Sequence, residues 1–128
     1  MKEVNNPKRL DGIRVVNDFH EIANALASGE TIAHFEFGNS MSGILESGQY
    51  VKLSPLGHTQ PKVGDVVFAQ VGDSYTCHMA LFYNQCTKKY GIGSTAGHVY
   101  CWSDKIIGIG TPMEYKEPTI NMFSPAYL

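Results

Sequence analysis

The sequence has no long hydrophobic run and little excess charge, and each absence excludes a class of protein. Its longest apolar stretches span only a few residues, whereas a membrane-spanning helix needs about 20. The first ten residues, MKEVNNPKRL, lack the apolar segment of a secretory signal. The formal net charge of -2 offers no broad basic surface for phosphates, so strong nucleic-acid binding is not expected. We expect a soluble, cytoplasmic protein without a transmembrane segment.

Cysteine is scarce as well, and the positions of the cysteines argue against a fold stabilised by disulfides or by a metal. The three cysteines, Cys77, Cys86 and Cys101, are odd in number and form no C-x-x-C pair. A disulfide framework and a common structural zinc site are therefore not expected. Four histidines also match no standard ligand spacing: His34, His58, His78 and His98. We expect no metal or cofactor, and reduced thiols that are partly buried.

The overall composition is that of one ordinary globular domain. The chain has 128 residues, of which 43% are hydrophobic and 17% charged, enough to bury a core but short for two independent domains. The pattern divides the domain 1–128 into an N-terminal segment (1–16), a helix (17–30), a β core (31–110) and a C-terminal tail (111–128). Within 1–16, the apolar residues do not decide between a strand and an entry loop.

A short amphipathic helix is predicted at 17–30. Asp18 and Glu21 can form a capping box at its start, and Gly29 suits its end. The apolar residues between them repeat at i, i+3, i+4 and i+7: Phe19, Ile22, Ala23 and Leu26.

Beyond the helix the hydrophobic period changes to that of strands. Thr31, Ala33, Phe35 and Phe37 alternate with Ile32, His34 and Glu36, which predicts a half-buried strand. Further strands are predicted between turn-forming glycine, proline and asparagine residues: 50–53, 65–71, 74–83, 89–92, 98–102 and 105–109. Many short strands without βαβ alternation favour a mainly β, barrel-like fold. The tail from Thr111 contains three prolines and is expected to wrap the surface without pairing.

The chemistry is expected where the first of these strands ends. Ser40 follows Gly38 and precedes Gly43, so the backbone can turn sharply there and present the hydroxyl. Serines beside glycines are also common in ordinary turns, because their side chains bond to nearby backbone groups. The local residues alone leave both interpretations open.

Three stretches, GNSMSGILESGQYV, PKVGDVVFAQ and SYTCHMALFY, resemble signal peptidase I and the LexA-like self-cleaving repressors in motif, order and spacing. The resemblance continues through GIGSTAGHVYCWSDKIIGIG and covers roughly residues 35 to 110. It implies a signal-peptidase/LexA-like barrel-like β fold with Ser40 as nucleophile and His78 as general base. Bacterial members carry a lysine at the second position, whereas archaeal and endoplasmic-reticulum signal peptidases carry a histidine. His78 places the chain nearer the second group.

The chemistry of these residue types agrees with that implication. A serine hydroxyl becomes a good nucleophile only when a neighbouring base accepts its proton. Imidazole, with an ordinary pKa of about 6.5, is mostly neutral at pH 7 and can serve without strong desolvation. On the residues alone, the alternative for His78 is a strand histidine bonded to a neighbour.

The resemblance also implies candidates for the remaining roles. The histidine branch orients its base with a downstream aspartate, for which Asp104 is the candidate, whereas Asp65 corresponds to a structural turn residue. The oxyanion of the tetrahedral intermediate needs preorganised donors, and Ser40, Asn39 and Met41 are the expected oxyanion and substrate-binding residues.

These expectations combine into a serine endopeptidase that cleaves a peptide bond of another protein, with small residues near that bond. The alternative is a catalytically inactive member of the fold that binds a peptide or protein partner. Aromatic residues that could line such a groove are Tyr75, Phe82, Tyr83, Tyr90 and Trp102.

Overall fold

A computed structural model describes residues 8–36, 38, 40–45 and 48–116. They form one helix, α1 (Phe19–Ala27), and nine strands: β1 (Arg9–Leu10), β2 (Ile13–Val15), β3 (Ile32–Glu36), β4 (Gln49–Pro55), β5 (Val66–Val71), β6 (Ser74–Asn84), β7 (Lys89–Gly93), β8 (Val99–Ser103) and β9 (Lys105–Lys116). The strands form one sheet in the order β1-β2-β3-β4-β9-β5-β6-β7-β8. The mainly β prediction is confirmed. The sheet is open, however, with β1 and β8 at its edges, so the expected barrel is not closed.

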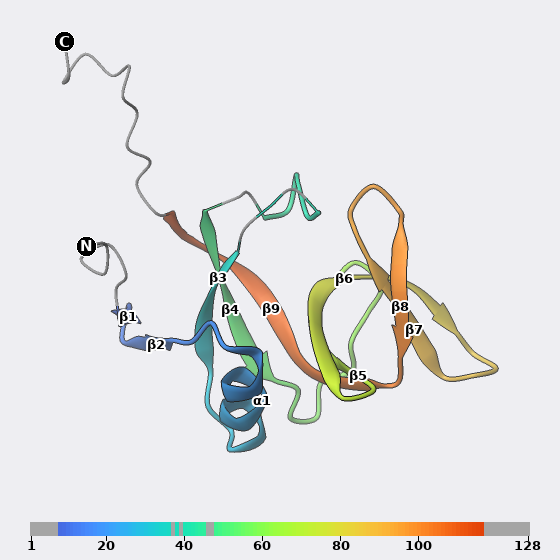
Figure 1. Ribbon diagram of the computed structural model, residues 1–128, viewed down its shortest axis with the longest axis horizontal. Coiled ribbons are helices and arrows are strands. Elements are labelled where there is room, and N and C mark those ends of the chain that lie inside the picture. Colours follow the sequence, from blue (N-terminus) through green and yellow to red (C-terminus); the bar gives the residue numbers. More distant parts are fainter. Residues whose placement is uncertain (1–7, 37, 39, 46–47, 117–128) are drawn as a thin grey trace, which may run out of the picture.

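Strand β9 joins two halves of the molecule (Figure 1). The first half contains α1 and β1 to β4, and the second contains β5 to β8. The early part of β9 pairs with β5 and its later part with β4, and Gly110 is opposite both Leu53 and Val66. A Cβ at Gly110 would lie 2.8 Å from Val51 Cγ2 and 2.9 Å from Val66 Cγ1. The close approach of three strands therefore requires glycine at this point.

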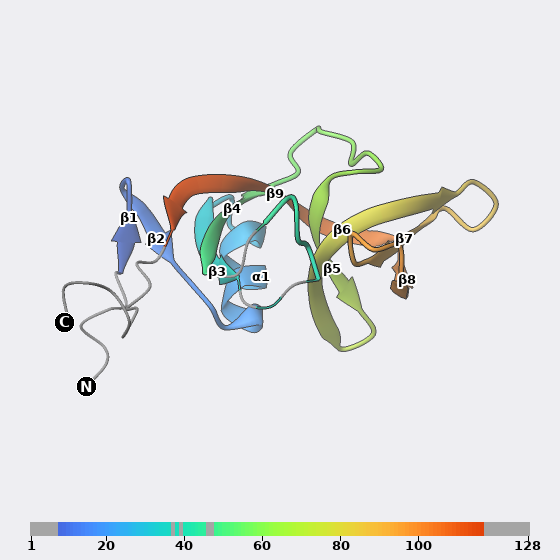
Figure 2. The same cartoon turned by 90° about the horizontal axis from the view of Figure 1, so that it is seen from above.

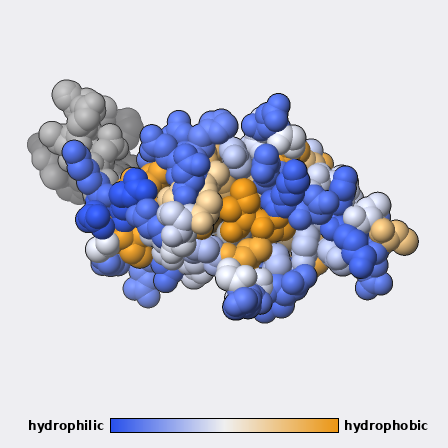
Figure 3. All heavy atoms as spheres, turned by 90° about the horizontal axis from the view of Figure 1, so that it is seen from below, coloured by the Kyte–Doolittle hydropathy of each residue, from blue (hydrophilic) through white to orange (hydrophobic). Residues whose placement is uncertain are grey.

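The main hydrophobic core draws on both halves. Helix α1 packs against β3, β4, β6 and β9, and Figure 2 shows it on one side of the sheet. The core residues come from the helix, from the loop after β3 and from five strands or segments: Val16, Ile22, Ala23, Ala25, Leu26, Ile32, Met41, Leu45, Val51, Leu53, Val66, Phe68 and Cys77. Viewed from below, hydrophobic side chains gather near the middle of the molecule, between hydrophilic surfaces (Figure 3).

The helix begins and ends as its sequence predicts. Asp18 is the N-cap, and its Oδ1 accepts a hydrogen bond from the Glu21 N–H at 3.0 Å. Ser28 is the C-cap, and Gly29 follows with a φ of 90°, a left-handed conformation that suits glycine. The predicted helix is thus confirmed, with its regular part shorter than 17–30.

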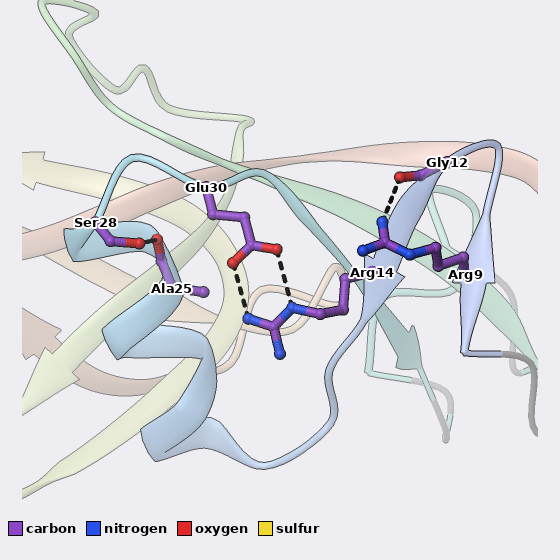
Figure 4. Close-up of polar contacts among 6 residues, drawn as sticks. All are labelled: Arg9, Gly12, Arg14, Ala25, Ser28 and Glu30. Atoms are coloured by element: carbon purple, nitrogen blue, oxygen red, sulfur yellow. Dashed lines mark hydrogen bonds and ion pairs between the residues drawn. The ribbon is translucent and has the colours of Figure 1, made fainter.

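One short βαβ unit lies at the start of the chain, although the sequence showed no such alternation. Strand β2 runs parallel to β3, and α1 is the crossover between them. Arg14 on β2 forms a two-pronged ion pair with Glu30 after the helix, at 2.8 and 2.9 Å (Figure 4). Both side chains are exposed, so the pair fixes local geometry more than it stabilises the fold.

The C-terminal boundary of the β core was predicted wrongly. Strand β9 continues to Lys116, and Pro112 lies within it, opposite Val51. Beyond Gly110, β9 pairs with β4 alone, so one edge of the strand needs no donor there. A proline, which lacks an N–H, fits such an edge. Pro118 and Pro125 lie outside the described residues.

The described part of the chain contains no helix long and apolar enough to cross a membrane. Its three cysteines are free thiols: Cys77 is buried, Cys86 exposed and Cys101 intermediate. Burial raises the pKa of the Cys77 thiol far above its ordinary value, which makes that thiol unreactive.

The packing of the core can be tested by replacing one buried and one exposed phenylalanine with alanine. Phe68 is fully buried and its ring lies 5.3 Å from that of Phe19, so Phe68→Ala should lower the free energy of unfolding by about 3–5 kcal/mol. Phe82, on the neighbouring strand β6, is 53% exposed, and Phe82→Ala should change it by less than about 1 kcal/mol. Urea titration measures both, and equal losses would contradict the packing described.

Candidate functional site

Ser40 lies in a turn that is fixed to the rest of the molecule on two sides. The chain leaves β3 through Gly38, which has a φ of 90°. Immediately after Ser40, the side chain of Met41 is buried in the core, and a hydrogen bond of 2.7 Å runs from the Leu45 N–H to the Met41 carbonyl. The N–H of Thr95, between β7 and β8, donates to the Ser40 carbonyl at 2.7 Å. The nucleophile candidate is therefore held by both halves.

His78 lies in β6, on the second half, and reaches the Ser40 turn. Its Nδ1 is 3.2 Å from Ser40 Oγ, within hydrogen-bonding distance. The ring of Tyr100, on β8, meets the imidazole edge to face with centroids 5.0 Å apart, which restricts its rotation. The structure thus brings together two residues that are 38 positions apart in the chain.

The environment of His78 favours the neutral imidazole. The residue is half-buried, and this burial lowers its pKa from the ordinary 6.5. Nδ1 accepts a hydrogen bond from Ser40 Oγ when the ring proton is on Nε2. At neutral pH the pair therefore has a proton donor and an unoccupied proton acceptor in contact.

Asp104 is not brought to His78. It is exposed, at the turn between β8 and β9. The neighbouring Lys105 is opposite Gln70 on β5, whereas His78 is opposite Val67 on the other side of that strand. Three residues of strand correspond to about 10 Å, which leaves Asp104 beyond hydrogen-bonding distance of the imidazole.

The second carboxylate considered from the sequence, Asp65, lies directly before β5. Asp65 Oδ2 accepts a hydrogen bond from the Lys62 N–H at 2.8 Å, as a structural turn residue should. The Met41 side chain is only 1% exposed, so Met41 can contribute only its main-chain N–H. Asn39 lies outside the described residues.

Beside His78 is a cavity of about 380 Å³ that sequence reasoning did not predict. Its lining comes from the start of α1, from β3 and from β6: Phe19, His34, Phe35, Glu36, Tyr75, Thr76, Cys77 and His78. His34 Nε2 and Glu36 Oε1 are 3.7 Å apart, and both residues are at least nine-tenths buried. Alternation predicted one polar, solvent-facing side for β3, but both of its sides are covered.

Burial shifts both of these groups toward their uncharged forms. It raises the pKa of Glu36 from 4.5 to about 7 and lowers the pKa of His34 from 6.5 to about 4. His34 Nδ1 is buried without a hydrogen-bond partner. A buried polar atom without a partner is unfavourable and rare. For the His34 ring, a backbone interaction with Val16 opposes the larger effect of burial on its pKa.

The candidate aromatic groove residues are divided between interior and surface. Tyr75 stacks on Phe68, and Tyr90 is buried with its hydroxyl donating to the Pro61 carbonyl at 2.7 Å. Phe82, Tyr83 and Trp102 are 53%, 38% and 45% exposed. Phe82, Tyr83 and Trp102 are therefore available at the surface, and Tyr75 lines the cavity beside His78.

Among the described residues, no group of three or more histidines, cysteines and carboxylates lies close enough to hold a metal ion. Comparisons of the chain with protein-family models, with curated proteins and with solved structures find no match. The geometry of the described residues is thus the basis for a functional assignment.

The two buried groups should give opposite pH dependences of stability. Because the pKa of Glu36 is raised in the fold, its contribution is full below pH 4.5 and is lost as the pH rises through about 7. Because the pKa of His34 is lowered, its contribution is full above pH 6.5 and is lost as the pH falls through about 4. In the wild type the two trends offset each other between pH 4.5 and 6.5.

Single variants should separate these trends. In His34→Gln the free energy of unfolding should fall by about 1–3 kcal/mol from pH 4.5 to 7, and in Glu36→Gln it should rise by a similar amount from pH 4 to 6.5. Urea titrations at half-unit pH steps measure both. Parallel curves for the two variants would show that burial does not dominate either group.

Proposed function

We propose that this protein is a serine peptidase of the signal-peptidase/LexA type, with Ser40 as nucleophile and His78 as general base. The observation that carries the proposal is the 3.2 Å separation of Ser40 Oγ and His78 Nδ1. The motif resemblance selected the same two residues from the sequence alone. The lowered pKa of His78 supports a neutral base at pH 7, and the doubly anchored turn supports a fixed nucleophile.

The proposed reaction is acyl transfer to water. Ser40 Oγ attacks the peptide carbonyl carbon while His78 Nδ1 takes the hydroxyl proton. The imidazolium then gives that proton to the leaving amine, and the acyl group remains on Ser40. Water attacks the acyl-enzyme with His78 again as base and regenerates the serine. Main-chain N–H groups near Ser40 stabilise the oxyanion.

In this proposal the catalytic unit is a dyad. The edge-to-face contact with Tyr100 orients the His78 imidazole, and orienting the base is the task that a third residue performs in a triad. A role for Asp104 would require it to act from a distance, so an Asp104 variant separates the dyad from the triad.

A second candidate function is peptide binding without catalysis. The exposure of Phe82, Tyr83 and Trp102 on β6 and β8 favours it, because aromatic side chains at a surface often anchor partners. This candidate needs no reaction at Ser40, so the same experiment distinguishes it from the peptidase.

The test is covalent labelling with a fluorophosphonate that reacts with activated serines. Wild type should be labelled at Ser40, Ser40→Ala should not be labelled, and His78→Ala should react on the order of 10² to 10⁴ times more slowly. Asp104→Asn should react within about twofold of wild type if the unit is a dyad. Intact-mass and peptide-mass measurements follow the rate and the site.

Exposed serines provide the control for specificity. Ser42, two residues from Ser40, is exposed, and Ser42→Ala should leave labelling of Ser40 at the wild-type rate. Absence of labelling in the folded wild type, or the same rate in Ser40→Ala, would remove the peptidase proposal and favour the binding protein.

Labelling should also depend on pH in one direction. Protonated His78 cannot accept the serine proton, so the rate should rise with pH and level off. Because burial lowers the pKa of His78, the midpoint should lie below 6.5. Rates measured from pH 4.5 to 8.5 test this, and a midpoint well above 6.5 would point to a different base.

A further inference from the structure

The cavity beside His78 is lined by both aromatic and polar side chains. Phe19, Phe35 and Tyr75 are among its lining residues, together with His34 and Glu36. Its volume of about 380 Å³ is within the range of cavities that bind small ligands or side chains. Because His78 itself lines the cavity, a side chain bound there belongs to a substrate residue close to the scissile bond.

The Glu36 carboxyl group in this cavity lacks a cationic partner within the described part of the chain. Glu36 has no hydrogen bond to its carboxyl group there, and His34 is beyond hydrogen-bonding distance at 3.7 Å. No lysine or arginine is among the lining residues. A buried carboxyl group that lines a cavity together with aromatic rings is complementary to a cation that arrives from outside.

We propose that this cavity is a specificity pocket for a basic side chain, lysine or arginine, of a peptide substrate, with Glu36 as the partner of the cation. The assignment rests on the proposed peptidase function and names its substrate class. It replaces the expectation of a small residue at this position, because a small side chain would leave most of the volume and the Glu36 carboxyl group unused.

Charge distinguishes the basic side chain from other occupants. An acidic side chain would face Glu36 and be repelled, and an apolar one would bury the carboxyl group without a partner. The raised pKa of Glu36, about 7, is that of a carboxyl with no nearby cation to stabilise its charge. A bound ammonium or guanidinium group would supply that charge, while the aromatic rings contact the aliphatic stem.

The experiment uses two peptidyl phosphonate esters that differ only in one side chain, lysine or its neutral isostere norleucine. Wild type should be labelled at Ser40 about 10- to 100-fold faster by the lysine probe, as expected for a charge-assisted hydrogen bond in a partly buried site. Glu36→Gln should bring this ratio close to one. Glu114→Gln, which removes an exposed carboxylate on β9, should leave the ratio at its wild-type value.

Two further measurements keep the test decisive. Binding of the matched lysine and norleucine peptides to Ser40→Ala requires no reaction, and the lysine peptide should bind at least tenfold more tightly. If Glu36→Gln does not fold, n-butylammonium should slow labelling of wild type by the lysine probe, whereas 1-butanol at the same concentration should not.

The outcomes separate the pocket from the peptidase. Labelling of Ser40 at equal rates by both probes, equal binding of both peptides, or equal protection by the two butyl compounds would overturn the pocket and leave the peptidase standing. Failure of both probes to label Ser40, together with tighter binding of the lysine peptide, would overturn the peptidase and support the pocket.

Discussion

The pairing of β9 with both β4 and β5 is the constraint on which the rest of this molecule depends. Ser40 follows β3 in the first half, and His78 belongs to β6 in the second. Neither half contains both groups. At Gly110 the three strands meet with space for no side chain, and the shared core beneath fixes the angle between the halves. The 3.2 Å contact is a product of long-range packing.

Local contacts then restrict the positions of Ser40 and His78 once they lie close together. The Met41 side chain fixes the Ser40 turn from below, and the Thr95 N–H holds the Ser40 carbonyl from the other half. Tyr100 limits the motion of the imidazole. Each contact restricts a group that must otherwise lose conformational freedom when it acts. The polar cavity is built with β3 and β6 as well, so His78 both contacts Ser40 and lines the cavity.

Sequence patterns predicted the features that short-range physics determines. The N-cap residue Asp18 and the terminating Gly29 located the helix. Alternation of apolar and polar residues, together with turn residues, located the strands. The continuation of β9 through Pro112 could not be predicted, because it depends on which edge of the strand is unpaired. The burial of Glu36 was missed for a similar reason, since alternation cannot show that α1 and β6 cover that face. Ser40 and His78 were selected through the family resemblance; spacing alone says nothing of their distance.

The place of β9 in the chain has a consequence for biosynthesis. It is the last of the described strands along the chain but the fifth of nine across the sheet. A nascent chain therefore exposes the serine and the histidine before the central strand exists to align them, and non-local strand pairing is slow to form. The Ser40–His78 contact therefore forms only after the polypeptide has been made as far as Lys116.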